Sequence, residues 1–240
     1  MKLSGNTILI TGGATGIGLG LTERFLKEGN KVIICGRRKQ ALHEAQRLFP
    51  AVITQQADLE RESDRIALFE WIKKNHKDCN VLINNAGIQQ RITVTEDDFF
   101  AKAKQEIAIN VEAPLHLTSL FLKLDNLDTI MNVTSGLAFV PMVRMPVYCA
   151  TKSFLHSFSS SLGKLLRERN IEVIEIIPPA LNTDLGGKGL HDGYPPVSEF
   201  IESIFAQLRE GKTKLTFGMS AMMVKAGPEE MENAFNRMNP

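Results

Sequence analysis

Short apolar runs alternate with longer amphipathic stretches along the chain, and this alternation constrains the fold more than any other feature. The runs are rich in β-branched residues and lack polar alternation, which is typical of parallel strands covered on both faces. Repeated strand–helix–strand units imply right-handed crossovers. The sequence therefore predicts an α/β fold, with a doubly wound and mostly parallel seven-stranded sheet. The expected strands are Thr7–Thr11, Lys31–Cys35, Val52–Gln55, Val81–Asn84, Thr129–Val133, Val173–Ile177 and Lys214–Phe217. The expected helices are Gly18–Lys27, Gln40–Leu48, Arg61–Asn75, Phe99–Leu122, Val147–Arg167, Ser198–Arg209 and Glu229–Met238.

Length and composition argue for one domain and against several classes of partner. The chain has 240 residues and no internal repeat or flexible linker, so residues 1–240 are expected to form one domain. A net charge of +1 argues against nucleic acid and against an anionic membrane surface. No apolar run is long enough for a signal peptide or a membrane span. Cys35, Cys79 and Cys149 form no disulfide or metal pattern, so we expect small buried residues in a cytoplasmic protein.

The first expected strand runs into a glycine-rich turn, TGGATGIG at Thr11–Gly18. Gly12, Gly16 and Gly18 would let the backbone turn tightly and let a pyrophosphate approach the amino end of the next helix. The spacing differs from the common Gly-x-Gly-x-x-Gly fingerprint, and no Gly-Lys-Ser/Thr of a P-loop follows. A flexible strand-to-helix turn is the alternative. The place of the motif, in the first strand–helix unit, favours a dinucleotide site.

The second expected strand ends in two arginines instead of a carboxylate. In a dinucleotide site, an acidic residue at this point binds the adenosine ribose hydroxyls. Here Arg37 and Arg38 follow Cys35 and Gly36, and guanidiniums can grip a 2′-phosphate by paired hydrogen bonds. We therefore predict NADP as the cofactor, with NAD less favoured. A solvated basic turn is the alternative.

Tyr148 and Lys152 stand at positions i and i+4 of an expected helix, so their side chains share one face. A free phenol has a pKa near ~10 and a free lysine amine near ~10.4, so neither is a good neutral-pH acid or base alone. An ammonium beside the phenol, helped by a bound nicotinamide's charge, would lower the pKa of the phenol. The pair is predicted to donate a proton to a carbonyl oxygen as hydride arrives, or to accept one in reverse.

Together these motifs resemble the short-chain dehydrogenase/reductase family, and the resemblance covers nearly the whole chain. It rests on the glycine turn, the run Asn84–Gly87, Ser135 after the fifth expected strand, and Tyr148-x-x-x-Lys152. The resemblance implies a Rossmann fold with Tyr148 as catalytic acid/base. It implies that Lys152 binds the nicotinamide ribose and tunes the phenol, and that Ser135 binds the substrate oxygen. Asn110 resembles the residue that holds a water in the proton relay.

The resemblance also implies a set of cofactor contacts and no metal. Asp58-Leu59 resembles the adenine-contacting pair, and Asn85-Ala86-Gly87 resembles the turn that supports the cofactor. Each of these residues also has a purely structural alternative, such as a turn former or a capped surface group. The full set of expected cofactor contacts is Gly12, Thr15, Gly16, Ile17, Gly18, Arg37, Arg38, Asp58, Leu59, Asn85, Ala86, Gly87, Tyr148, Lys152, Pro178 and Thr183.

The chain departs from the family pattern after the sixth expected strand. The family has Pro-Gly there, followed by a threonine that meets the nicotinamide amide, whereas this chain has Pro178-Pro179 with Thr183 in register. Proline fixes φ and removes an N–H, so we expect a differently shaped turn. The glycine-rich segment Asp184–Pro196 is expected to be a loop near the substrate. The apolar segment Gly136–Val147 is expected to wall the substrate pocket, with ordinary packing as the alternative.

We considered three functions for a chain with these residues. The first is an NADP-dependent oxidoreductase that interconverts a carbonyl and a secondary alcohol, with Ser135 and Tyr148 on the substrate. The second is an NADP(H)-binding redox sensor or scaffold without turnover, and the altered Pro179 turn favours it. The third, an extended-type enzyme for nucleotide sugars, lacks the necessary chain length.

The resemblance also implies an assembly state and a subgroup. The family's usual dimer-forming elements correspond to the two long expected helices, so we expect a homodimer or homotetramer. The chain is most similar to the subgroup encoded beside the enzymes that D-alanylate teichoic acids in Gram-positive bacteria. That similarity rests on the starting run Met1–Gly18, NNAGIQ at Asn84–Gln89 and FGMS at Phe217–Ser220. A genomic association names no substrate.

Overall fold

All seven expected strands form, and they build one sheet in the order β3-β2-β1-β4-β5-β6-β7. The computed structural model describes residues 1–240. Every neighbouring pair of strands is parallel, so the expected doubly wound sheet is confirmed and is parallel throughout. The strands are β1 Thr7–Thr11, β2 Lys31–Gly36, β3 Ile53–Gln56, β4 Cys79–Asn84, β5 Thr129–Val133, β6 Glu172–Ile177 and β7 Lys214–Thr216.

The helices follow the expected order, with one interruption and one addition. The α-helices are α1 Gly16–Lys27, α2 Lys39–Leu48, α3 Glu62–Asn75, α4 Phe99–Ile107, α5 Ala113–Phe121, α6 Pro146–Leu165, α7 Val197–Arg209, α8 Met219–Lys225 and α9 Pro228–Met238. Three short helical segments are η1 Ala108–Glu112, η2 Gly136–Ala138 and η3 Arg167–Arg169.

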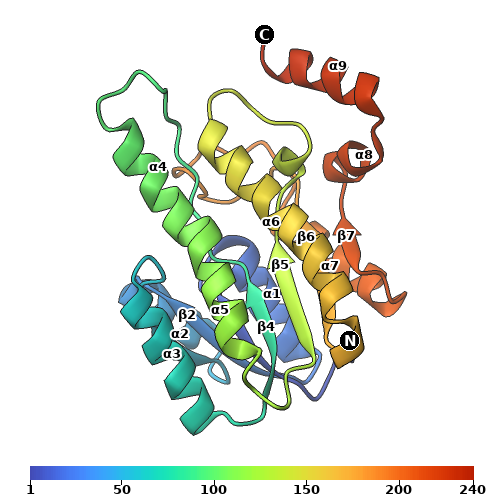
Figure 1. The fold of residues 1–240 in the computed structure, drawn as a ribbon. Coiled ribbons are helices and arrows are strands. Elements are labelled where there is room, and N and C mark those ends of the chain that lie inside the picture. Colours follow the sequence, from blue (N-terminus) through green and yellow to red (C-terminus); the bar gives the residue numbers. More distant parts are fainter.

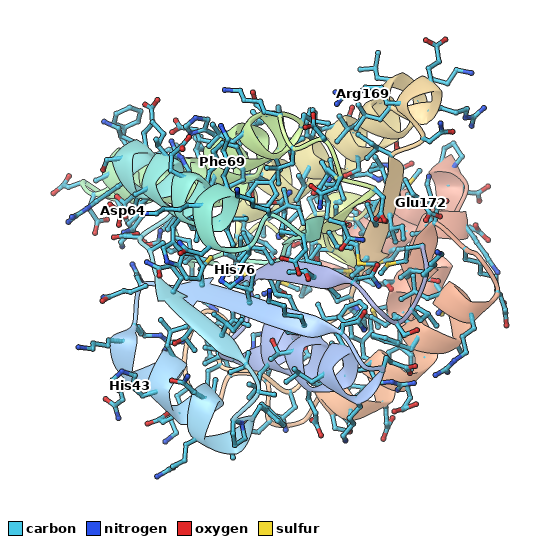
Figure 2. The ribbon with its side chains drawn as sticks, turned by 90° about the horizontal axis from the view of Figure 1, so that it is seen from below. His43, Asp64, Phe69, His76, Arg169 and Glu172 are labelled. Carbon is cyan, nitrogen blue, oxygen red and sulfur yellow. The ribbon has the colours of Figure 1, made fainter.

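Both faces of the sheet are buried, which explains why its strands lack polar alternation. On β1, Ile8 and Ile10 point to the core under α1, α2 and α7, whereas Leu9 points to the core under α3, α5 and α6. Figure 2 looks along the sheet from below and shows α3, with Phe69, and α2, with His43, on opposite sides of it. Side chains on alternate positions of each strand therefore serve two separate cores.

The strand order places a crevice beside the first turn of the chain. From β1 the chain winds outward to β3, and from β4 it winds in the other direction to β7. The switch point lies between β1 and β4, which pair directly. In doubly wound sheets, ligands bind outside the carboxyl ends of the strands at this point. The ends of β1, β4, β5 and β6 carry most of the residues singled out in the sequence.

The single helix expected over Phe99–Leu122 is interrupted at its centre. One turn of π-helix, η1, joins α4 to α5, and the residues on both sides of it keep helical backbone angles. Pro114 explains the interruption, because a proline has no N–H for the α-helical bond to the carbonyl at i−4, which here belongs to Asn110. A π-bulge of this kind often marks a functional site.

The C-terminal helices lie above the carboxyl ends of the strands (Figure 1). Helix α8 was not expected from the sequence, since its few residues are too short for a clear periodicity. The C-terminal Asn239 donates to the carbonyl of Pro141 at 3.1 Å and accepts the N–H of Val143 at 2.8 Å. The end of the chain is thereby tied to the segment between β5 and α6. No helix has the length and apolar character needed to cross a membrane.

Candidate active site

The glycine turn after β1 is closed so tightly that there is no room for a side chain at Gly18. A Cβ on Gly18 would lie 2.2 Å from the carbonyl oxygen of Gly12 and 2.5 Å from the Asn85 amide nitrogen. Gly12 and Gly16 have φ values of +64° and +53°, in the left-handed region that favours glycine. Thr15 is the last extended residue before α1, and Ile17 lies in its first turn. The turn thus offers bare backbone at a helix N-terminus.

The end of β4 supports this turn from the side. The Asn85 side chain donates to the carbonyls of Thr11 at 2.8 Å and Gly12 at 3.2 Å. In return the Thr11 hydroxyl accepts the backbone N–H groups of Asn85 and Ala86 at 2.9 and 3.0 Å. These bonds bind the two strand ends on either side of the switch point into one rigid unit.

The expected adenine end of the site has basic residues and no carboxylate on β2. Arg38 reaches back across the crevice and donates to the Thr15 hydroxyl at 3.3 Å. Arg37 is exposed beside it, and its carbonyl accepts the Gln56 amide at 3.0 Å. The guanidinium of Arg38 therefore stands next to the glycine turn, with a free donor edge.

Asp58 and Leu59 follow β3 in a hydrogen-bonded turn. The Asp58 N–H donates to Asp64 at 2.9 Å, and the Asp58 carboxylate accepts the N–H of Glu60 at 3.3 Å. Leu59 is buried, and its carbonyl accepts the Arg65 guanidinium at 2.8 Å. These contacts account for the shape of the turn, so its expected role toward an adenine ring stays a prediction.

The four residues expected to be catalytic come from three elements, and all of them are buried. Tyr148 and Lys152 lie on α6, Ser135 lies just after β5, and Asn110 lies in η1. Gly87 is where two of these elements meet, since a Cβ there would lie 3.3 Å from the Asn110 side-chain oxygen and 3.5 Å from the Lys152 ammonium. The motifs that are far apart in the sequence thus bring their side chains together at the carboxyl edge of the sheet.

The buried ammonium of Lys152 donates a single hydrogen bond. Its Nζ donates to the carbonyl of Val133 at 2.8 Å. Burial lowers the pKa of Lys152 to about 8. The amine is therefore close to a protonation change near neutral pH, which an exposed lysine is not.

Tyr148 differs from the expectation that a neighbouring ammonium would make it acidic. Burial is the largest influence and raises the pKa of Tyr148, while the interaction with the Ser135 hydroxyl lowers it in part. The Lys152 Nζ lies 5.7 Å from the centre of the phenol ring. Without a bound cofactor, the phenol is held in its neutral form, because the cost of desolvating a phenolate outweighs the attraction of a cation at that distance.

Ser135 and Asn110 are fixed by their own local bonds. The Ser135 hydroxyl caps η2 by accepting the N–H of Leu137 at 3.1 Å. The Asn110 side chain accepts the N–H of Ile88 at 2.9 Å, and it donates to the Ile88 carbonyl at 2.8 Å and to the Thr151 hydroxyl at 3.1 Å. Its side chain is used structurally, so the group of Asn110 left for a water is its main-chain carbonyl.

The Pro178-Pro179 turn still brings Thr183 to the cofactor crevice. The Pro178 carbonyl accepts the N–H of Gly136 at 3.0 Å, which joins the ends of β5 and β6. The Thr183 methyl carbon lies 3.4 Å from where a Cβ of Gly16 would stand, so Thr183 faces the glycine turn. Segment 184–196 then folds as turns, as expected. Asn182 N–H donates to the Pro195 carbonyl at 2.9 Å and closes the loop.

Apolar residues pack on one side of Tyr148, which is compatible both with the expected pocket wall and with ordinary packing. Met145, Tyr148 and Cys149 form a small buried cluster against Leu137, Met142 and Leu185. These residues come from the segment between β5 and α6 and from the loop after β6. The loop also approaches the end of β4, where a Cβ of Gly186 would lie 3.5 Å from the Gln89 carbonyl.

Two buried acids near the site were missed in the sequence. Glu175 lies inside β6, accepts the Thr134 hydroxyl at 2.8 Å and contacts His156 Nδ1 at 2.8 Å. Glu106, at the end of α4, is buried beside the cluster. Each looked like an ordinary polar residue of its element. The one available signal for Glu106 was its place one helical turn before Asn110.

The comparisons with known proteins agree with this arrangement. A family model described as short chain dehydrogenase matches residues 6–192. The chain is 42% identical over 249 residues to the oxidoreductase DltE of Bacillus subtilis (strain 168), covering 100% of this chain and 98% of DltE. This similarity agrees with the subgroup expected from the sequence.

Solved structures with the same fold carry either form of the dinucleotide. A short-chain dehydrogenase from Burkholderia cenocepacia J2315, in complex with NADP, is 24% identical, with a TM-score of 0.85 and 99% of both chains covered. A short-chain dehydrogenase/reductase from Burkholderia phymatum, in complex with NAD, is 17% identical, with a TM-score of 0.85 and 100% and 99% of the two chains covered. With the family model and the DltE match, the chain belongs to the short-chain dehydrogenase/reductase family of oxidoreductases.

Proposed function

We propose that this protein is an NADP-dependent oxidoreductase that interconverts a carbonyl and a secondary alcohol, with Tyr148 as the acid/base. The main support is the convergence of Tyr148, Ser135, Lys152 and Asn110 at the edge of the sheet that also carries the glycine turn. A sensor without turnover would need the turn but not the buried phenol and ammonium, which are costly to bury. The catalytic group is therefore the feature that favours an enzyme over a binding protein.

The residues of the crevice fit a nicotinamide dinucleotide. Space excludes a side chain at Gly18, positive φ disfavours one at Gly12 and Gly16, and the N–H groups at the start of α1 suit a pyrophosphate. Asn85, Ala86, Gly87, Pro178 and Thr183 would border the nicotinamide half. Asp58 and Leu59 would border the adenine. When bound, the dinucleotide supplies the hydride that the protein itself cannot provide.

The protein's own residues would handle the proton and the substrate. The Ser135 hydroxyl would hold the substrate oxygen near the phenol, and Tyr148 would donate its proton to that oxygen in reduction or accept it in oxidation. Lys152 would hold the nicotinamide ribose and supply positive charge next to the phenolate form. The main-chain carbonyl of Asn110, freed by Pro114, would anchor a water that links the Lys152 amine to solvent.

Arg37 and Arg38 support NADP over NAD. Neither is paired with a carboxylate, and Arg38 already lies against the glycine turn through Thr15. A 2′-phosphate at the end of β2 would meet two guanidiniums, whereas bare ribose hydroxyls would meet no carboxylate there. The NADP-bound relative from Burkholderia cenocepacia is compatible with this preference.

The apolar wall around Tyr148 favours a moderately apolar small-molecule substrate. The protein is expected to be cytoplasmic, in keeping with three free and buried cysteines. We also propose that it works as a homodimer or homotetramer.

A substrate panel tests the proposal. Wild-type protein is mixed with a series of aldehydes, ketones and alcohols, and NADPH or NADH absorbance is followed. We expect turnover of at least one apolar carbonyl and a Michaelis constant for NADPH roughly tenfold or more below that for NADH. A clear preference for NADH would refute the NADP assignment. Binding of NADPH without turnover across the panel would favour the sensor.

A further inference from the structure

One carboxyl group of the site has no role in the chemistry above. Glu106 ends α4 one helical turn before Asn110, and its side chain has 0% exposure. Its Oε1 accepts the backbone N–H of Gln90, which lies in the loop between β4 and α4. Its Oε2 is buried and has no hydrogen-bond partner. A buried carboxylate oxygen without a donor is costly, so stability does not explain a glutamate at this position.

The titratable groups that face Glu106 from α6 are Tyr148 and Cys149. The pKa of each is raised mainly by burial, and the negative charge of Glu106 raises it further. Lys152 lies farther along the same helix and gives its ammonium to the Val133 carbonyl. Helix α4 packs against α6, and Gln89, the neighbour of the Gln90 that Glu106 holds, contacts Met145 of the cluster that contains Tyr148. Glu106 is thereby linked to the surroundings of the phenol, and no α6 cation pairs with it.

The remaining elements around Glu106 also offer it no cation. Lys102, one turn earlier on α4, pairs with Asp98 at 3.0 Å and with Glu96 at 3.2 Å on the surface. Arg91, next to Gln90, is exposed. The carboxyl group thus has one neutral donor, the Gln90 N–H, and can lower its cost of burial only by taking up a proton.

We propose that Glu106 is a positioning residue that holds the Gln90 backbone and sets, by its own protonation, how readily Tyr148 gives up a proton. This inference rests on the proposed function of Tyr148. A neutral Glu106 keeps Oε1 as an acceptor for Gln90 and makes Oε2 a hydroxyl. An ionised Glu106 adds a negative charge beside the phenol, which disfavours phenolate and makes Tyr148 a weaker acid.

Both forms of Glu106 are accessible near neutral pH. Burial raises the pKa of Glu106 to about 7, and the Gln90 N–H offsets part of this effect. Carbonyl reduction, which needs a proton from Tyr148, should therefore be faster below this pH than above it. In the oxidation direction, where Tyr148 must accept a proton, ionised Glu106 should instead support the protonated phenol.

The test compares wild type, Glu106→Gln and Glu106→Leu, with exposed Glu112→Gln as the matched control. The kcat/KM for reduction is measured between about pH 5 and about pH 9. Wild type and Glu112→Gln should lose roughly twofold to fivefold in kcat/KM across an inflection near the pKa of Glu106. Glu106→Gln, which keeps an acceptor for Gln90, should lose the inflection near the pKa of Glu106, while any inflection from Lys152, whose pKa is about 8, should be common to all variants. Glu106→Leu should lose activity at every pH, because it also releases the loop.

A readout without turnover uses the unliganded protein. The infrared band of a protonated carboxyl group should be present in wild type below about pH 6 and should fade as pH rises through neutrality. It should be absent in Glu106→Gln and unchanged in Glu112→Gln. A wild type without this band, or a Glu106→Gln protein that keeps the inflection near the pKa of Glu106, would overturn the inference. An equal loss in Glu106→Gln and Glu106→Leu at every pH would mean a structural role only and would overturn it as well.

Failure of the proposed function has a different signature. If Tyr148→Phe turns substrate over as fast as wild type, Tyr148 is not the acid/base and the inference loses its basis, even if the infrared band is present. If turnover depends on Tyr148 while the pH profile ignores Glu106, the proposed function stands and this inference alone is wrong.

Discussion

Burial, more than pairing, governs the ionisable groups of this site. The sequence placed an ammonium beside a phenol, and both residues are where the motif predicts. What the spacing could not show is that both groups lose their water: the pKa of Tyr148 rises and that of Lys152 falls to about 8. Tyr148 is thereby held in its neutral form, and Lys152 is brought within reach of deprotonation near neutral pH. Both side chains lie on one face of α6, as the spacing predicts, and in the protein without cofactor burial outweighs the influences that would make the phenol acidic.

Replacement of Lys152 should make the protein more stable and less active. The unfolded pKa of lysine lies above the folded value, so the cost of the buried charge is full below about pH 8 and vanishes above about pH 10.5. Lys152→Met should therefore raise the free energy of unfolding by about 1–3 kcal/mol at pH 7, less at alkaline pH. Urea unfolding at several pH values measures this. Lys164→Met, an exposed site on the same helix, is the control, and a destabilised Lys152→Met at pH 7 would contradict the account.

Among the elements, the interrupted helix from α4 to α5 matters most for function. Its existence and ends followed from periodicity, but its central π-turn did not, because a helical pattern does not reveal one extra residue per turn. A signal was nevertheless present in Pro114, four residues after Asn110. By contrast, the glycine turn was predictable in both place and purpose, since only glycine fits at Gly18. Motifs that require a residue type are visible in sequence, and buried acids such as Glu106 and Glu175 are not.

Restoring the missing helical donor should disturb the site without unfolding it. Pro114→Ala supplies an N–H that can bond to the Asn110 carbonyl and convert η1 into regular helix. We expect a thermal midpoint equal to or above that of wild type and a loss of kcat of roughly tenfold or more, because the relay water loses its acceptor. Differential scanning calorimetry and steady-state kinetics give the two readouts. Unchanged kcat with a regular helix in a crystal structure would argue against a role for the freed carbonyl.

At the scale of the whole molecule, the sheet could be predicted from the sequence, but the surfaces that bind partners could not. The alternation of apolar and amphipathic stretches predicted the strands and their crossovers. Binding of partner proteins depends instead on which apolar side chains stay exposed on the folded surface. An apolar hollow of about 480 Å³ lies between α4 and α6, and Ile107 and Phe154 on its rim are 42% and 41% exposed. Helices α4 and α6 run along the same side of the sheet in Figure 1. This surface is where the proposed homodimer or homotetramer would place a second copy of the chain.

A charge in the hollow should separate the copies. We expect wild type to be a dimer or tetramer by light scattering coupled to size exclusion, and Phe154→Asp to be a smaller species, since a buried unpaired charge at an interface costs several kcal/mol. Leu48→Asp, at a position 60% exposed on α2, should leave the assembly unchanged. A monomeric wild type, or a Phe154→Asp protein of unaltered mass, would contradict the proposed assembly.

The account as a whole depends on the phenolic oxygen of Tyr148 carrying the proton of the reaction. Tyr148→Phe removes that oxygen and keeps the ring against Met145 and Cys149, so its kcat compared with wild type is the most direct measurement. NADPH affinity, followed by fluorescence on the same samples, should change by less than about threefold, while kcat should fall by about a hundredfold or more. A Tyr148→Phe protein that binds NADPH and turns carbonyls over at the wild-type rate would contradict it.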